Sequence, residues 1–157
     1  MDADGPIVIA YDGSAAARAA IRLAGRHLRP DRELIVLNVY QPIESVRFVG
    51  AAGVVLPPDA DQQVRAASDA LAQEGSALAR EQGFEASGVV VDMADTIWGT
   101  IVQVANQHEA SLILLGTHGR SGVRATLLGS VATAVMHHAG RPVAVVPAAY
   151  AEAHAAA

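Results

Sequence analysis

Continuous runs of apolar residues alternate along this chain with segments in which apolar residues recur every three or four positions. A run of roughly four to eight apolar residues is typical of a strand buried on both faces, and the wider spacing is typical of an amphipathic helix. The runs predict strands over residues 6–10, 33–39, 84–91, 112–115 and 143–146. The periodic segments predict helices between them, over residues 14–28, 59–81, 95–108 and 130–140.

Alternation of this kind predicts an α/β fold, with a five-stranded parallel sheet, right-handed crossovers and four helices on both faces. At 157 residues, the chain has the size of a single doubly wound domain, residues 1–157, and can bury a sizeable core. We expect flexible ends at residues 1–5 and 148–157, the second of which is rich in alanine. The pattern alone leaves the order of the strands open.

The helix starts and the apolar faces give finer predictions. Ser14 and Asp95 stand where they can cap the helices that follow, and Ser130 either caps the next helix or turns its hydroxyl toward a phosphate oxygen. Trp98 lies on the flank of its helix, so we expect it in the core or at an interface. Apolar spacing predicts the buried face of helix 59–81 from Val64, Ala67, Leu71, Gly75 and Leu78, and that of helix 130–140 from Val131, Ala134, Val135 and His138.

The segment between residues 41 and 59 is long for a loop inside a compact domain. Loops of this length are usually functional or disordered. Because the segment is also rich in valine, with a phenylalanine and a leucine, we interpret it as a flap over a site or as part of a partner surface.

Composition excludes several kinds of chemistry. The chain has no cysteine, which rules out disulfides, thiolate catalysis and cysteine-ligated metals. All 11 basic residues are arginine, so Schiff-base catalysis and the lysine of a Walker A loop are also excluded. The net charge of −5 argues against nucleic acid as a partner. No apolar run reaches the roughly 20 residues that span a bilayer and residues 1–4 are unlike a signal peptide, so we expect a cytoplasmic protein with no membrane partner.

A glycine-rich loop between the strand at 112–115 and the helix at 130–140 is the stretch most indicative of function. Glycines let a backbone turn sharply and approach a ligand closely, while a helix start presents unpaired N–H groups and a partial positive charge. Together these features make an anion site and favour phosphate binding. A tight strand-to-helix connection explains the glycine content equally well.

The spacing of these glycines is more specific than their number. Gly116, Gly119 and Gly129-Ser130 follow the pattern G-x2-G-x9-G-[ST] without insertion or deletion. This pattern closely resembles the nucleotide-binding motif of the universal stress protein family, in its ATP-binding type. The resemblance extends to residues 7–14 and 38–40, at the first two strands. It implies strand order 3-2-1-4-5, with a switch point between the first and fourth strands, where open α/β sheets bind ligands.

The resemblance also implies a site for ATP, with or without Mg2+. Ala10 and Asp12 would lie beside the base and ribose, and Val39 would pack against the adenine. Backbone N–H groups would hold the phosphates at Gly116, Gly119, Gly129, Ser130 and Val131.

Several functions remain open at this point. The first is an adenine-nucleotide binding module for stress response or signalling, non-catalytic or a very slow hydrolase. The second is a slow ATPase or autophosphorylating protein that uses Ser121 or Ser130, and the third is a cyclic AMP binder of the same fold. Because the glycine loop has no carboxylate for Mg2+ and Asp12 is the only nearby candidate, we expect any hydrolysis to be slow. We expect no metal site at the adjacent His137 and His138, which point about 100° apart on a helix.

The last predicted strand, residues 143–146, raises the question of assembly. As an exposed apolar edge of the sheet it would invite pairing with another strand. The resemblance implies such pairing across a two-fold axis, so we expect a homodimer through Val143–Val146. The sequence does not indicate a protein partner of another kind.

Overall fold

The computed structural model of the chain describes residues 4–42, 57, 59–117 and 128–153. Within these residues the chain forms one five-stranded sheet in the order β3-β2-β1-β4-β5, with every pair of neighbours parallel. The predicted α/β class and strand order are thereby confirmed. The strands are β1 (Ile7–Ala10), β2 (Glu33–Tyr40), β3 (Glu85–Asp92), β4 (Leu112–Gly116) and β5 (Val143–Val146). The helices are α1 (Ala15–His27), α3 (Ala60–Glu81), α4 (Ile97–Gln107), α5 (Ser130–His138) and α6 (Ala148–Ala153).

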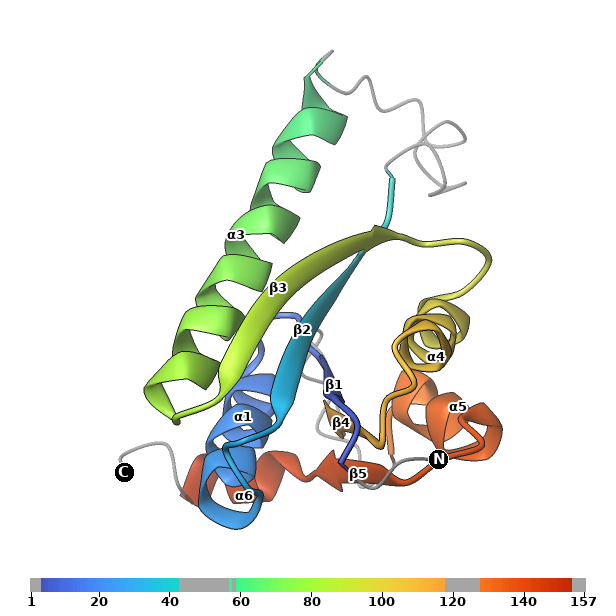
Figure 1. Cartoon of the computed structure of the whole chain (residues 1–157). Coiled ribbons are helices and arrows are strands. Elements are labelled where there is room, and N and C mark those ends of the chain that lie inside the picture. Colours follow the sequence, from blue (N-terminus) through green and yellow to red (C-terminus); the bar gives the residue numbers. More distant parts are fainter. Residues whose placement is uncertain (1–3, 43–56, 58, 118–127, 154–157) are drawn as a thin grey trace.

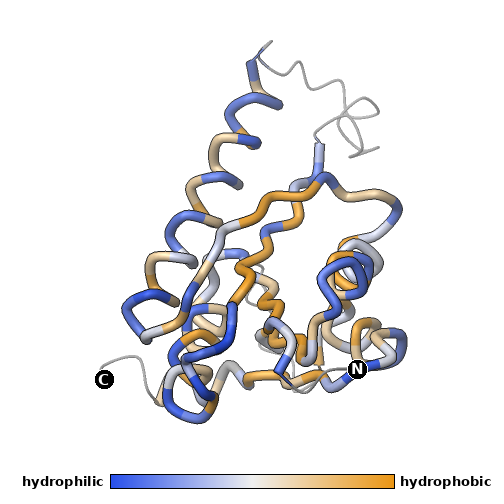
Figure 2. The backbone as a smooth tube through the Cα atoms, viewed as in Figure 1, coloured by the Kyte–Doolittle hydropathy of each residue, from blue (hydrophilic) through white to orange (hydrophobic). Residues whose placement is uncertain are grey.

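Helices cover both faces of the sheet, with α1, α3 and α6 on one side and α4 and α5 on the other (Figure 1). Successive strand residues point to opposite faces, and both faces are packed. Ile7 and Ile9 belong to the core on the α1 side, whereas Val8 belongs to the core on the α4 side, and none of the three is exposed. This burial on both faces explains the continuous apolar runs, which stand out along the central strands in Figure 2.

The buried face of α3 differs from the predicted one. Val64 and Ala67 are exposed, because the first turns of α3 project beyond the sheet (Figure 1). Leu71 and Leu78 are partly buried against the core, and Gly75 is buried, as predicted. The stripe that faces the sheet consists of small residues, which bring the helix backbone close to the strands: Ser68, Ala72, Gly75, Ser76 and Ala79.

Capping was predicted correctly at one helix and wrongly at another. The Ser14 hydroxyl accepts a hydrogen bond from the Ala17 N–H at 3.2 Å. The cap of α4 is Thr96 and not Asp95, since Thr96 has the extended backbone of an N-cap and its hydroxyl accepts from the Gly99 N–H at 3.1 Å.

The start and the face of α5 also differ from the prediction. Gly129 is the N-cap residue and Ser130 begins the helix, so Ser130 is not the cap. Of the predicted stripe, Val135 is buried and Val131 packs partly buried against the core, whereas the other buried residue, Ala132, was not predicted. His138 is exposed, and its ring stacks on half-buried Trp98 with centroids 4.7 Å apart. Trp98 itself packs against the core, as expected.

Two other predictions concern the segment after β2 and the tail. Most of the segment between residues 41 and 59 lies outside the described residues, so its role stays a prediction. The tail from Ala148 begins with the short helix α6, where a flexible end was expected, and Tyr150 packs against the core on the α1 side.

Within the described part of the chain, no helix combines the length and apolarity needed to cross a membrane.

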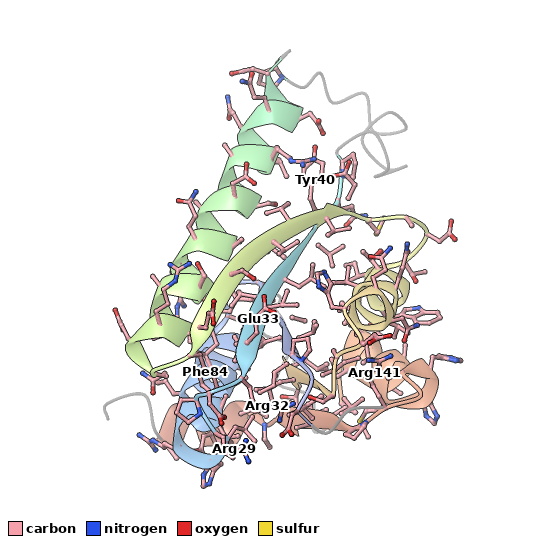
Figure 3. The ribbon with its side chains drawn as sticks, viewed as in Figure 1. Arg29, Arg32, Glu33, Tyr40, Phe84 and Arg141 are labelled. Carbon is pink, nitrogen blue, oxygen red and sulfur yellow. The ribbon has the colours of Figure 1, made fainter. Side chains whose placement is uncertain are left out.

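Arginines tie together the amino-terminal ends of the strands (Figure 3). The Arg32 guanidinium donates to the Gly5 carbonyl and to the Ser111 hydroxyl, which itself donates to the Gly5 carbonyl at 2.8 Å. Arg141 donates to the carbonyls of Ala105 and Ala110, at the end of α4. These bonds fix the sheet at the end opposite to the one where β1 and β4 release their loops.

Candidate functional site

The carboxyl ends of β1 and β4 form a switch point in the sheet. The two strands are neighbours, yet the chain after β1 enters α1 on one face and the chain after β4 leads to α5 on the other. The connections therefore diverge and leave a crevice between them, which is where ligands bind in open α/β sheets.

The turn after β1 is held by its own side chains. The Tyr11 N–H donates to the Leu37 carbonyl at 2.8 Å, which continues the pairing of β1 with β2 by one residue. The Asp12 carboxylate accepts from the Ser14 N–H at 3.0 Å, and Gly13 between them has a positive φ of 76°. An aspartate that accepts from the backbone two residues on is typical of a tight turn. The Asp12 carboxylate is thus fixed at the mouth of the crevice.

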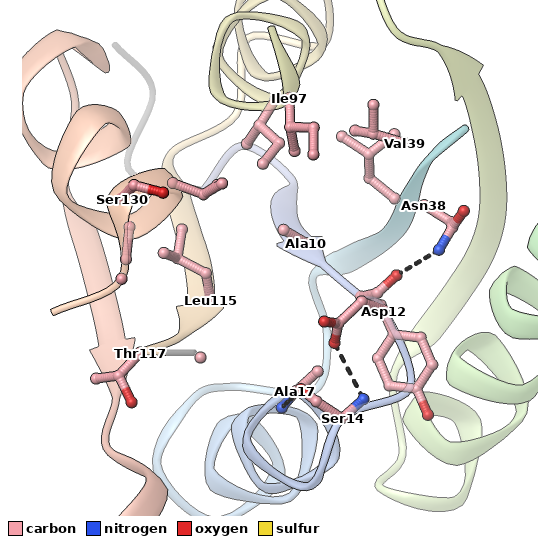
Figure 4. Close-up of a pocket in the computed structure, with 17 residues that line it drawn as sticks. Ala10, Asp12, Ser14, Ala17, Asn38, Val39, Ile97, Leu115, Thr117 and Ser130 are labelled. Atoms are coloured by element: carbon pink, nitrogen blue, oxygen red, sulfur yellow. Dashed lines mark hydrogen bonds between the residues drawn. The ribbon is translucent and has the colours of Figure 1, made fainter. Parts of the chain in front are cut away.

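A buried asparagine supports this turn from β2. Asn38 is only 6% exposed, and its amide nitrogen donates to the Tyr11 carbonyl at 2.8 Å (Figure 4). The sequence placed Asn38 only within the family resemblance at residues 38–40 and gave it no role at the site. A signal was present, because a polar residue interrupts the apolar run of β2, and buried polar side chains require a partner.

The ends of the glycine loop are pinned to each other. The Thr117 N–H donates to the Val146 carbonyl at 2.9 Å, and the Gly129 N–H donates to the Thr117 carbonyl at 2.8 Å. Gly129 thus joins the end of β4 directly to the first turn of α5, whose N–H groups open toward the crevice.

Gly116, the first glycine of the motif, serves close packing. A Cβ atom at Gly116 would lie 2.6 Å from the Ala16 Cβ and 3.1 Å from the Ala16 carbonyl carbon. Only glycine allows the end of β4 to approach the first turn of α1 this closely. Close packing is therefore enough by itself to require glycine at this position of the motif.

Residues from both connections line one cavity of about 440 Å³ (Figure 4). Gly119 lies outside the described residues. The lining contains all the other predicted site residues: Ala10, Asp12, Val39, Gly116, Gly129, Ser130 and Val131. The lining is mostly apolar with a few polar groups, so a large apolar group and a small number of polar groups can be accommodated together. Lining residues that sequence reasoning missed include Asn38, Ile97, Ile101, Leu115 and Thr117.

The charges around the cavity are few. Among the lining residues that the structure describes, Asp12 is the one ionisable side chain besides the Tyr11 phenol, and none is an arginine. An anion in this cavity would therefore depend on backbone N–H groups and on the positive end of α5. Within the described residues, no group of histidine, aspartate and glutamate side chains is arranged to hold a metal ion.

A hydrogen-bond network runs from the cavity to the surface. The Tyr11 hydroxyl donates to the Glu74 carboxylate at 2.5 Å, and the Arg18 guanidinium donates to the same oxygen at 2.8 Å. Bonding to Tyr11 and to Arg18 lowers the pKa of Glu74, although partial desolvation opposes this. Burial, followed by the bond to Glu74, raises the pKa of Tyr11. The network joins α1, α3 and the turn after β1.

This network predicts an acid dependence of stability. A carboxylate with a lowered pKa stabilises the fold above its unfolded pKa, and this contribution is lost as pH falls through the lowered folded value. We expect Glu74→Gln to unfold at a lower temperature than the parent at pH 7, with the difference shrinking in the acid range. Thermal unfolding at several pH values between 7 and 3 measures it. A constant difference at all these pH values would contradict the prediction, and Asp69→Asn on the same helix is the control.

Comparison with known proteins decides the family. The model of the universal stress protein family matches residues 5–147. The chain belongs to this family. A universal stress protein of Mycobacterium tuberculosis is 32% identical over 143 residues, which cover 89% of this chain and 44% of the relative. One of Methanocaldococcus jannaschii is 39% identical over 85 residues, which cover 45% of this chain and 49% of the relative. The chain thus spans about half the length of these universal stress proteins.

Solved structures share the fold. Hypothetical protein MJ0577 has a TM-score of 0.75 at 22% identity, covering 93% of this chain and 97% of that one. The universal stress protein of Archaeoglobus fulgidus in complex with dAMP has a TM-score of 0.66 at 22% identity, covering 90% and 97%. A universal stress protein in complex with cAMP has a TM-score of 0.61 at 22% identity, covering 90% and 95%. At these identities, the similarity shows the universal stress protein fold.

Proposed function

We propose that this universal stress protein domain binds an adenine nucleotide, ATP with or without Mg2+, in the cavity at the carboxyl ends of β1 and β4. The observation that carries the proposal is that an apolar cavity at the switch point has a carboxylate at one wall and a helix start at the other. The structures of relatives in complex with dAMP and cAMP support an adenine nucleotide as the ligand class.

The two walls suit the two ends of a nucleotide. The side chains of Ala10, Val39 and Ile97 offer an apolar surface for the base, and a carboxylate at Asp12 accepts hydrogen bonds from ribose hydroxyls. The backbone N–H and C=O groups of alternate residues in a strand face the same neighbouring strand. The Leu37 carbonyl faces β1, so the backbone N–H and C=O of Val39 point to the same side, just beyond the end of β1. On the opposite wall, the backbone of Gly116, Gly119, Gly129, Ser130 and Val131 would hold the phosphates.

Binding without rapid turnover is the form of the proposal that these residues favour. Phosphoryl transfer requires groups that position water and hold Mg2+, and Asp12 is the one carboxylate in the described lining. The domain would therefore act as a stress-response or signalling module through nucleotide occupancy. A slow hydrolase would release labelled phosphate above the protein-free rate, with the excess lost in Asp12→Ala. Transfer of label to the protein, lost in Ser130→Ala, would indicate autophosphorylation.

Thermal unfolding with ATP, ADP, AMP and cyclic AMP, each with and without Mg2+, tests the proposed ligand. A ligand at 100 times its dissociation constant adds about 2.7 kcal/mol to the free energy of unfolding. For a domain of this size, we expect the midpoint to rise by roughly 5–10 °C with ATP. A larger rise with cyclic AMP would favour the cyclic nucleotide binder, and no rise with any nucleotide would contradict the proposal.

We also propose a homodimer through β5. The outer edge of β5 has no neighbouring strand among the described residues, and Val143, Ala144 and Val145 are each only partly buried. Met136 of α5, which packs beside β5, is 54% exposed. An apolar edge of this kind is suited to pairing with a second copy.

Val145→Lys tests the dimer. A lysine on the edge strand would place a charge against its symmetry mate, so we expect the variant to be monomeric at concentrations where the parent is dimeric. Light scattering gives the mass directly. An unchanged dimer mass in Val145→Lys would overturn this interface, and Val64→Lys, on the projecting part of α3, is the control.

A further inference from the structure

Tyr11 is held by β2 through both of its main-chain groups. Its N–H donates to the Leu37 carbonyl and its carbonyl accepts from the Asn38 side chain, each at 2.8 Å. The regular register of β1 with β2 ends at Ala10, paired with Leu37. The Asn38 amide therefore takes over from the main-chain ladder at the position where the strand becomes a turn.

The bond between the Asn38 side chain and the Tyr11 carbonyl also holds the backbone of Asp12 in place. Consecutive Cα atoms are about 3.8 Å apart across a rigid peptide plane, so the Tyr11 carbonyl and the Asp12 backbone belong to one unit. The Asn38 bond fixes this peptide from β2, while the Tyr11 hydroxyl is fixed by Glu74 from α3 at 2.5 Å. Asn38 is buried and contacts the peptide that carries Asp12, whereas Asp12 lines the cavity.

We propose that Asn38 is a positioning residue that determines specificity through Asp12: it sets the preference of the site for nucleotides that carry ribose hydroxyls. The inference rests on the proposed function. A carboxylate held in place accepts hydrogen bonds from these hydroxyls, and a ligand without them leaves it without that partner. When this peptide is released, the Ser14 N–H still holds the carboxylate, but the carboxylate is less firmly placed and the advantage of a hydroxylated ligand falls.

The experiment compares dissociation constants for AMP and 2′,3′-dideoxy-AMP by titration calorimetry. In the parent we expect AMP to bind at least about tenfold more tightly, the effect of a hydrogen bond to a charged group. In Asn38→Ala this ratio should fall below about threefold, mainly through weaker binding of AMP. Asp12→Ala should lose the ratio as well, and adding Asn38→Ala to it should change the ratio no further, because one residue acts through the other.

Two controls separate positioning from general stability. Asn38→His should restore the ratio, since its Nδ1 lies as many bonds from the backbone as the amide nitrogen it replaces and can donate to the Tyr11 carbonyl. Ser111→Ala removes a buried hydroxyl bond at the other end of the sheet, so it should lower the unfolding temperature and leave the ratio unchanged. If Asn38→Ala does not fold, Asn38→Ser takes its place, because its hydroxyl is too short to make the same contact.

The possible outcomes distinguish the two proposals. Equal weakening of both ligands in Asn38→Ala, with the parent ratio kept, would overturn the positioning role. A parent that binds both ligands equally would overturn it too, while leaving the proposed nucleotide site intact. A parent that binds no adenine nucleotide would overturn the proposed function itself.

Discussion

Gly129→Leu is expected to weaken adenine-nucleotide binding by at least roughly 100-fold, about 2.7 kcal/mol of binding free energy. Gly129 lines the cavity and is the N-cap residue of α5, so a side chain there would compete with the phosphates of the proposed nucleotide for the same space. Its backbone, at φ −60° and ψ 152°, is open to any residue, and leucine therefore adds volume without backbone strain. Titration calorimetry with ATP measures the change.

A graded series makes this prediction specific. Gly129→Ala adds one methyl group and should retain most of the affinity, whereas leucine should remove it. The Gly129 N–H bond to the Thr117 carbonyl is unaffected by either change, so the unfolding midpoint without ligand should stay close to the parent value. Parent-like affinity in Gly129→Leu would show that the phosphates do not reach the start of α5.

The second large effect is expected at Gly88, in the middle of β3. A Cβ atom there would lie 2.5 Å from the Ala72 carbonyl oxygen and 2.8 Å from its carbonyl carbon. Both atoms belong to the backbone of α3, so the helix must move away from the sheet to admit even a methyl group. Overpacking of this kind costs about 1–3 kcal/mol, and we expect Gly88→Ala to lower the unfolding midpoint by roughly 3–10 °C.

Ser87→Ala is the matched control, because its side chain points to the opposite face of β3 and its effect should stay within about 0.5 kcal/mol. A parent-like midpoint for Gly88→Ala would show that α3 packs less closely on the sheet than the Ala72 contact indicates. The result matters for the site, because α3 carries Glu74, which holds the Tyr11 hydroxyl.

The elements of the fold could be predicted because the strands of a parallel sheet that is buried on both faces consist of nearly uninterrupted apolar residues. The runs of β1 and β4 are almost fully buried in the structure, and β5 has the predicted bounds. Strand order was a different matter, since each run fits any place in the sheet equally well. That order came from the resemblance carried by Gly116, Gly119 and Gly129.

The wrong predictions have tertiary causes. Val64 has the apolar character and spacing of a core position, but it is 37% exposed because its turn of α3 extends past the sheet. The N-cap residue of α4 is Thr96 and not the predicted Asp95. Both residue types are suited to capping, and the helix starts one residue later than predicted. In α5 the apolar spacing identified Val135 correctly but missed the buried Ala132 and included the exposed His138, since a nine-residue helix has only about two and a half turns in which the pattern can repeat.

Some residues that line the candidate cavity were predicted from the sequence and others were missed. Asp12 and Gly129 are far apart along the chain and were assigned to one cavity only through the family motif, and the structure brings both to its lining. Asn38 and Ile97 were missed because their contribution depends on which strand or helix lies beside β1. The nucleotide itself stays a proposal that the cavity geometry and the relatives support.

Backbone amide shifts on titration with ATP, followed by nuclear magnetic resonance, test the central claim most directly. The proposed site predicts saturable shifts at both walls of the cavity together, at Asp12 and Val39 on one side and at Gly129, Ser130 and Val131 on the other. Amides near Arg32 and Ser111, at the opposite end of the strands, should remain unchanged. Shifts confined to the outer surfaces of the helices, or no shifts at millimolar ATP, would contradict the claim that this cavity binds the nucleotide.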